Sequence, residues 1–168
     1  PSMATKLSYG WIRKGVNKDI KTTASRTRLN ILGAIDLDSM SVFSKDYKTI
    51  DAANTCDFLE YLKAKITNKK IHIFLDNGPS NNNKKVKAKA KELGIGIHYL
   101  PTYSPNCNPI ERLWKVMNKI VRNNIFFKSA KDFKDKIKEF FDETWDKVKK
   151  RYVSWINDNF QVLKKSVF

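Results

Sequence analysis

The sequence lacks the segments that would place a protein in or across a membrane. Its 168 residues contain no uninterrupted apolar run of the roughly 18 residues that a transmembrane helix needs. The first residues, PSMATKLSYGW, hold no apolar stretch of the kind found in signal peptides. We therefore expect no membrane partner and a cytoplasmic location.

Cysteine and histidine are also scarce. The two cysteines, Cys56 and Cys107, lie far apart and lack the spacing of metal ligands, so we expect two reduced thiols. The two histidines, His72 and His98, have no further ligand at a useful spacing and are interpreted as strand residues. Neither residue type therefore predicts a metal site.

Acidic residues are in the minority. Seventeen Asp and Glu stand against 33 Lys and Arg, which gives a net charge of +16. A charge of this size attracts polyanions, chiefly nucleic acid or an anionic membrane. The alternative is a basic surface that only keeps the protein in solution. We favour nucleic acid.

The N-terminal part has the pattern of an antiparallel meander. Short aromatic or aliphatic segments bounded by turn residues predict strands over residues 8–15, 28–37 and 41–49. The chain then alternates, with a helix over 51–67 that Asp51 could cap.

A second alternation of strand and helix follows. Strands are expected over 69–78 and 95–101, with a helix over 82–93 between them, an order that predicts parallel pairing in a mixed sheet. From Ile110 the pattern is helical, with a second helix from Ser129 and a last helical piece over 151–160. We therefore expect one α/β domain.

Two acidic residues occupy unusual places. Asp76 ends an apolar strand, where α/β sheets bind ligands, although Asp76-Asn77-Gly78 is also a common turn sequence. Glu111 follows Asn108-Pro109-Ile110, an order typical of a helix start, so it could instead be the acid of a capping box.

Taken together, the two acids indicate metal-dependent chemistry. The helix, strand and proline-rich loop between them can return the chain to the same edge of the sheet. Two carboxylates that meet there repel each other unless a cation lies between them. Carboxylates favour hard ions such as Mg²⁺ or Mn²⁺, and an acidic pair within a basic surface suits the cleavage of phosphodiesters.

Two stretches together resemble a known family. IFLDNG, residues 73–78, followed by YLPTYSPNCNPIERLW, residues 99–114, resembles the DDE endonuclease domain of bacterial insertion-sequence transposases in the Tc/mariner superfamily. That family has a strand ending in Asp-Asn, then Leu-Pro-x-Tyr-Ser-Pro-x-x-Asn-Pro-Ile-Glu-x-x-Trp. All fixed positions of the second motif are filled here, by Leu100, Pro101, Tyr103, Ser104, Pro105, Asn108, Pro109, Ile110, Glu111 and Trp114. YGWIRKG, residues 9–15, resembles the family's early tryptophan-containing strand.

The resemblance implies a fold and an activity. The fold would be an RNase H-like mixed sheet flanked by helices, in one catalytic domain over residues 1–168 without the family's N-terminal helix-turn-helix. The family uses three acids to bind two Mg²⁺ or Mn²⁺ ions, cuts double-stranded DNA at transposon ends and joins it to target DNA. Asp76 would be the second acid and Glu111 the third, both catalytic metal ligands. A homodimer and a place at the bacterial nucleoid belong to the same expectation.

The family's first acid has no counterpart here. It lies on the central strand shortly before the YGW segment, and only eight residues precede Tyr9. We therefore expect this acid and most of its strand upstream of Pro1, so that the chain is a truncated domain or a gene remnant with weak or no activity. Asp36 and Asp38 are weaker substitutes, because they match a later strand.

Loss of the first strand would affect the sheet. In the RNase H-like sheet this strand lies between the second and the fourth, so its absence would leave two unpaired strand edges. We expect either that residues 1–8 partly fill the gap or that another chain supplies a strand.

Basic residues on two helices are candidate DNA contacts, with an ordinary solvated surface as the alternative. They are Lys84, Lys85 and Lys87 on the helix after Asp76, and Lys115, Lys119 and Arg122 on the helix of Glu111. The sequence thus predicts a metal-dependent DNA transposase domain. The alternatives are a non-catalytic DNA-binding remnant and another RNase H-like nuclease, which would not need the proline-rich motif.

Overall fold

The computed structural model describes the chain except for residues 7, 10–12, 17–18, 22–26, 103–106 and 160–168. Its strands are β1 (Asn30–Ile35), β2 (Val42–Tyr47), β3 (His72–Leu75) and β4 (Gly96–Tyr99). Its α-helices are α1 (Ala52–Lys65), α2 (Lys84–Glu92), α3 (Ile110–Met117), α4 (Ala130–Glu139) and α5 (Trp145–Val148). Two π-helical turns, Asn118–Arg122 and Phe140–Thr144, and the 3-10 turn Lys149–Arg151 continue these helices.

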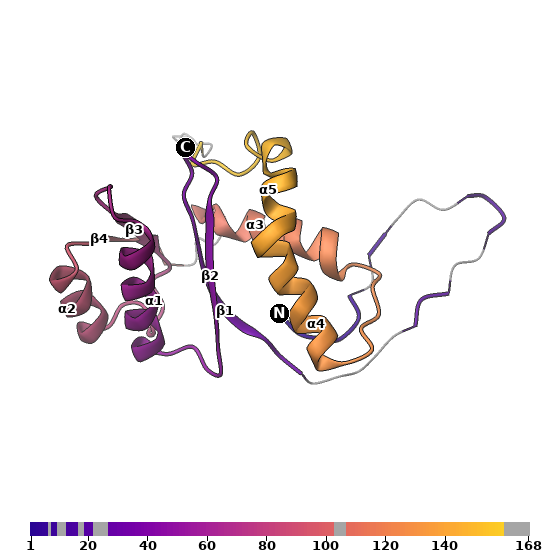
Figure 1. Ribbon diagram of the computed structural model, residues 1–168, viewed down its shortest axis with the longest axis horizontal. Coiled ribbons are helices and arrows are strands. Elements are labelled where there is room, and N and C mark those ends of the chain that lie inside the picture. The colour runs from indigo at the N-terminus through magenta and orange to yellow at the C-terminus, as the bar shows by residue number, and fades with distance from the viewer. Residues whose placement is uncertain (7, 10–12, 17–18, 22–26, 103–106, 160–168) are drawn as a thin grey trace, which may run out of the picture.

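The β1–β2 hairpin lies in the middle of the molecule (Figure 1). The two strands pair antiparallel, from Asn30 opposite Tyr47 to Ile35 opposite Val42, as the sequence predicted. The prediction of a further strand over residues 8–15 is wrong for the described residues of that segment. Tyr9 is fully exposed, and the backbone turns where the Val16 N–H donates to the Arg13 carbonyl at 3.1 Å. Residues 10–12, with Trp11, lie outside the described residues.

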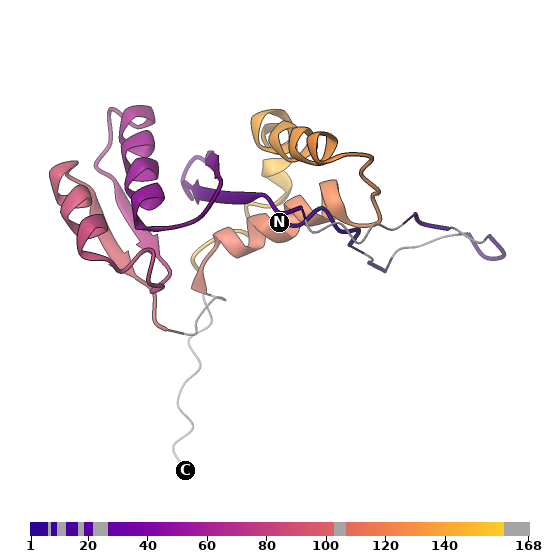
Figure 2. The same cartoon turned by 90° about the horizontal axis from the view of Figure 1, so that it is seen from below.

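Strands β3 and β4 form a second, parallel sheet on one side of the hairpin (Figure 2). Helix α1 begins as expected, because the Asp51 carboxylate accepts a hydrogen bond from the Asn54 N–H at 2.9 Å. Helices α1 and α2 cover one face of this sheet, and their shared core contains Leu59, Ile71, Val86, Ala90 and Ile95. The predicted parallel strand–helix–strand unit is therefore confirmed.

In the described part of the chain the four strands form two separate two-stranded sheets rather than one continuous mixed sheet. Among the described residues β1 pairs only with β2 and β3 only with β4, so each leaves one edge without a partner strand. Residues 1–6 lie elsewhere: Ser2 bridges to Arg28, ahead of β1, and Lys6 bridges to Asn123. The described residues among 1–8 therefore pair with the segment just before β1 and with Asn123, and they do not join the two sheets.

Helix α3 is anchored on β1 by one close contact. The Trp114 ring lies over Gly33, so close that a Cβ at Gly33 would be 2.8 Å from the ring carbon Cη2. The other side of Trp114 packs edge-on against Phe141. Trp114 is thus a packing residue, and its contact with Gly33 sets the position of the helix that carries Glu111.

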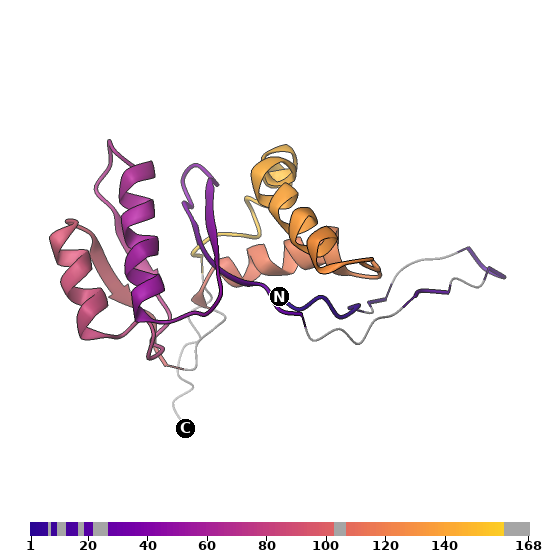
Figure 3. The same ribbon diagram turned by 60° about the horizontal axis from the view of Figure 1, so that its bottom comes forward.

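The C-terminal helices build the larger core beside α3 (Figure 3). Ser129 caps α4 by accepting from the Asp132 N–H at 3.0 Å, as expected. The helical piece predicted over 151–160 is wrong for its described residues: after the 3-10 turn the chain continues in turns. Arg112 holds these turns in place, because its guanidinium donates to the carbonyls of Trp155 at 2.8 Å and Asn157 at 3.0 Å. No helix in the described part of the chain has the length and apolarity needed to cross a membrane.

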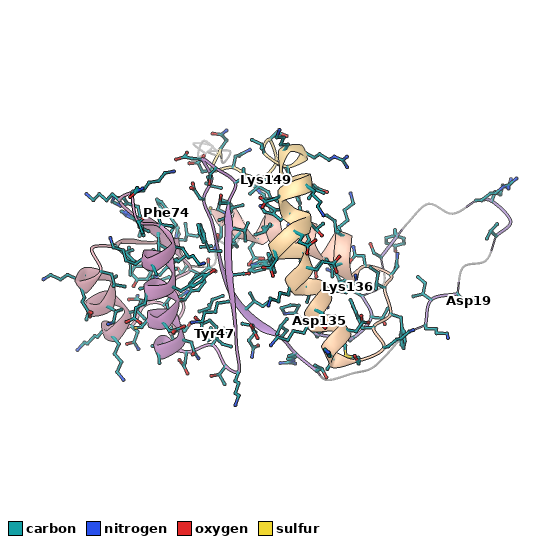
Figure 4. The ribbon with its side chains drawn as sticks, viewed as in Figure 1. Asp19, Tyr47, Phe74, Asp135, Lys136 and Lys149 are labelled. Carbon is teal, nitrogen blue, oxygen red and sulfur yellow. The ribbon has the colours of Figure 1, made fainter. Side chains whose placement is uncertain are left out.

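Asp57 of α1 connects the helix–sheet unit to the hairpin. It accepts hydrogen bonds from the Lys45 ammonium at 2.7 Å and the Tyr47 hydroxyl at 2.5 Å, both on β2. The Tyr47 side chain, at the end of β2, lies beside α1 (Figure 4). The bonds from Lys45 and then Tyr47 hold the pKa of Asp57 below its ordinary value. The two parts are thus joined here by a polar contact.

Replacing Gly33 should test how tightly α3 is seated. Gly33→Ala should lower the free energy of unfolding by about 1–3 kcal/mol, because the new methyl group displaces the Trp114 ring. Urea unfolding measures this. Gly78→Ala is the matched control, since a Cβ at Gly78 meets nothing within 4 Å. Equal effects of the two changes would contradict the contact.

The Asp57 contact should make stability depend on pH. A carboxyl group whose pKa is lowered by folding stabilises the native state above its ordinary pKa of 3.8 and loses this contribution as the pH falls through the lowered value. The wild type should therefore exceed Asp57→Asn in unfolding free energy more at pH 6 than at pH 2. A difference that does not change with pH would contradict the prediction.

Candidate functional site

Asp76 lies directly after β3 and is exposed. Its backbone carbonyl accepts from the Asn81 side chain at 3.1 Å, and Asn77 accepts from Asn82 at 2.7 Å. The turn itself comes just after the Asp76-Asn77-Gly78 stretch, where the N–H groups of Asn81 and Asn82 donate to the Gly78 carbonyl at 3.0 and 2.8 Å. The Asp76 carboxylate has a different partner.

That partner is Asn108, two residues before the start of α3. The Asn108 amide donates to Asp76 Oδ1 at 3.0 Å, and Asn108 Oδ1 accepts from the Ile110 N–H at 3.2 Å. One side chain thus joins the end of β3 to the first turn of α3. Glu111 is the second residue of that helix, so the two predicted acids belong to adjoining ends of neighbouring elements.

Glu111 is partly buried, and its carboxylate has no hydrogen-bond or ion-pair partner within the described residues. The capping-box interpretation is therefore wrong, because Asn108 satisfies the Ile110 N–H without a reciprocal bond from Glu111. Its position in the first turn still favours a negative charge through the helix dipole. The Glu111 carboxylate is thus free of competing protein cations among these residues.

A third ligand does not join the pair in the part of the chain that is described. There, no group of three or more His, Cys, Asp or Glu side chains is arranged to hold a metal ion. Asp36, offered as a substitute, accepts instead from the Ser39 hydroxyl at 2.8 Å and the Asp38 N–H at 3.0 Å. Burial opposes the ionisation of Asp36, but these bonds and Lys69 lower its pKa. Asp36 and Asp38 therefore serve the hairpin turn.

Five of the six predicted basic contacts are exposed. On α2 these are Lys84, Lys85 and Lys87, and on α3 and its π-helical continuation Lys115 and Lys119. The Lys87 ammonium lies 5.3 Å from the centre of the Tyr99 ring. Lys115 follows Glu111 by one helical turn, so the two share a face of α3.

Arg122 corrects the expectation, because its side chain is buried. Its guanidinium donates to the Ser2 carbonyl at 2.7 Å and to Asn118 Oδ1 at 2.6 Å. Burial lowers the pKa of this group. Arg122 therefore fastens the first residues to the helix and is not presented to DNA. The sequence offered no signal for this, since Ser2 and Arg122 are 120 residues apart in the chain.

Known proteins share both the sequence pattern and the fold. Residues 1–134 match the family model described as DDE superfamily endonuclease, whereas no curated protein matches the sequence. A chain of the Mos1 strand transfer complex is similar with a TM-score of 0.67 and 18% identity, over 93% of this chain and 48% of that one. The chain thus spans about half the length of the Mos1 chains in such complexes.

Two further structures bear on the fold class. The catalytic domain of Mos1 mariner transposase is similar with a TM-score of 0.64 and 18% identity, over 83% of this chain and 74% of that one. A chain of the simian T-cell lymphotropic virus intasome in complex with PP2A regulatory subunit B56 gamma is similar with a TM-score of 0.53 and 20% identity, over 81% of this chain and 53% of that one. The predicted RNase H-like α/β fold class is therefore confirmed.

Two substitutions of Asn108 should separate its two bonds. Asn108→Ala loses both, whereas Asn108→Asp keeps an acceptor for the Ile110 N–H and places a second carboxylate beside Asp76. Asn108→Asp should lower the free energy of unfolding relative to wild type, because like charges repel. This loss should be about 1 kcal/mol larger at pH 7 than at pH 4. Urea unfolding at both pH values measures this. Asn108→Ala is the control, and the same pH response in both variants would contradict the contact.

Proposed function

The chain belongs to the DDE superfamily endonuclease family, and from this premise we propose that residues 1–168 form the catalytic domain of a transposase that cleaves and joins DNA strands. The observation that carries the proposal is the Asn108 side chain, which bonds both Asp76 and the first turn of the Glu111 helix. Asp76 and Glu111 are proposed as the catalytic acids. Asn108 thereby links Asp76, directly after β3, to the first turn of the helix that carries Glu111.

The residues fit a hard divalent ion. Asp76 is exposed, and Glu111 has no protein cation bound to it among the described residues, so both can take part in the oxygen coordination that Mg²⁺ or Mn²⁺ prefers. Two such ions, with further ligands besides these two acids, would supply polarisation of the scissile phosphodiester and activation of the attacking oxygen. Asn108 would orient Asp76, as residues behind metal ligands commonly do.

The basic residues would hold the substrate. Lys115 lies one turn after Glu111 on α3 and Lys119 on its π-helical continuation, and Lys84, Lys85 and Lys87 lie on the helix after the Asp76 turn. With a net charge of +16, these exposed ammonium groups are suited to the phosphates of double-stranded DNA, at transposon ends and at a target. Structures of Mos1 include a paired-end complex with a transposon end, which supports DNA as the partner. By the same likeness we propose action as a homodimer.

The proline-rich motif supports a bacterial insertion sequence as the source. The chain would then act in the cytoplasm, on DNA of the nucleoid. A second candidate function has its own support: among the described residues no group of three or more His, Cys, Asp or Glu is placed to hold a metal ion. A DNA-binding remnant without catalysis is therefore the alternative.

Metal titration tests the proposal. Calorimetry with Mn²⁺ should give a site whose affinity falls at least about tenfold in both Asp76→Asn and Glu111→Gln. Asp142→Asn, which changes an exposed acid on a helix away from the site, is the matched control. Mn²⁺-dependent nicking of plasmid DNA, expected to be weak, should disappear in the same two variants.

The outcomes separate the two candidates. Binding of duplex DNA should weaken steeply with salt in either case. If Mn²⁺ affinity is the same in both site variants as in wild type, while duplex DNA still binds, the catalytic proposal is overturned and the remnant is favoured. Nicking that survives both substitutions would show that other residues carry it.

A further inference from the structure

One face of the β3–β4 sheet is left uncovered by α1 and α2. Helices α1 and α2 pack on the face of Ile73 and Ile97. Since side chains alternate along a strand, His72 and Phe74 of β3 and His98 of β4 point to the other face, and all three are exposed. Figure 4 shows Phe74 on β3, in the part of the molecule formed by α1 and α2. Asp76 is the next residue in this alternation.

The three rings on this face form a stacked ladder. A ring nitrogen of His72, Nδ1, lies 3.0 Å from Nε2 of His98, and one of the two donates to the other. The ring centres of this pair are 5.3 Å apart with planes inclined by 26°. Phe74 stacks on His98 at 4.9 Å and 23°. The rings therefore form a continuous stack that ends in Phe74.

A glycine makes the ladder possible. Gly96 lies opposite His72 in the parallel register, and a Cβ at Gly96 would be 2.6 Å from His72 Nδ1. A side chain at this position would push the His72 ring away from His98. The ladder thus depends on the local sequence of both strands.

The ladder ends in a large exposed apolar ring. Phe74 is 62% exposed, although one face of its ring rests on His98. A single exposed apolar residue needs no explanation, but this one completes a stack of three rings and lies two residues before Asp76. Two residues of a strand span about 7 Å. A nucleotide whose phosphate lies at Asp76 would therefore have a base one or two steps along within reach of Phe74.

We propose that Phe74, with His98 and His72 behind it, is a stacking surface for unpaired bases of the DNA strand held at Asp76 and Glu111. This inference rests on the proposed function for the identity of its ligand. Aromatic side chains beside a basic groove are the usual means of holding unpaired bases, because every base has a face that can stack. The net charge of +16 attracts such a strand and opposes a second copy of this chain as the occupant.

The experiment measures binding without metal, so that it does not depend on catalysis. The probes are labelled oligo-dT, a duplex with an unpaired 3′ extension and a blunt duplex of equal length. Phe74→Ala should weaken oligo-dT binding about 5- to 100-fold and leave blunt-duplex binding within about twofold. Gly96→Ala should act in the same direction. Val153→Ala, at another exposed apolar side chain, should have no effect.

A second variant distinguishes loss of the stacking surface from misfolding of the protein. Phe74→Trp should retain oligo-dT binding, and oligo-dT should quench the fluorescence of the new indole in comparison with wild type. Unchanged oligo-dT affinity in Phe74→Ala, or no added quenching in Phe74→Trp, overturns the inference. A change of sedimentation on Phe74→Ala with DNA binding intact also overturns it, in favour of a second copy on this face.

The inference and the proposed function fail separately. If Mn²⁺ affinity is unchanged in Asp76→Asn and Glu111→Gln while the Phe74 and Gly96 variants behave as expected, the stacking surface is supported and the catalytic proposal is overturned. If Mn²⁺ binds as expected and the ladder variants bind oligo-dT like wild type, the surface is rejected alone.

Discussion

The hydrogen bond from the Asn108 amide to Asp76 is the contact on which the candidate site depends. Asp76 ends a strand in one part of the molecule, and Glu111 begins a helix that packs with the other part. Two carboxylates repel each other at close range, so their approach needs an uncharged group that favours both positions. Asn108 is such a group, since its amide binds the strand end and its oxygen binds the helix start.

The rest of the structure holds this contact in place from both sides. Trp114 seated over Gly33 anchors α3 on the hairpin, while the buried face of β3 and β4 packs on α1 and α2. Asp57 joins the two parts through Lys45 and Tyr47 of β2. No strand among the described residues joins the two sheets, so the position of the acids relative to each other rests on side-chain contacts rather than on a continuous ladder of backbone hydrogen bonds.

Much of the architecture could be predicted, and the misses have physical causes. The hairpin, the parallel strand–helix–strand unit and the start of α4 follow from local periodicity and capping residues, which act within a few positions of each other. The strand expected over residues 8–15 had suitable residue types but no described neighbour to pair with. Arg122 shared a helix with Lys115 and Lys119, yet its guanidinium turned inward, because Ser2 offers a carbonyl there. Nothing in the order of residues reveals such a distant partner.

By itself, the sequence determined the charge, the order of strands and helices, and the two acids within a motif that resembles one family. These properties are local, since each depends on residue type and on neighbours within a few positions. Only the tertiary structure decided that Asn108 binds Asp76, that Gly96 lets His72 meet His98, and that the two sheets remain separate. Each of these depends on where distant segments lie relative to one another, which is set by the packing of the two cores.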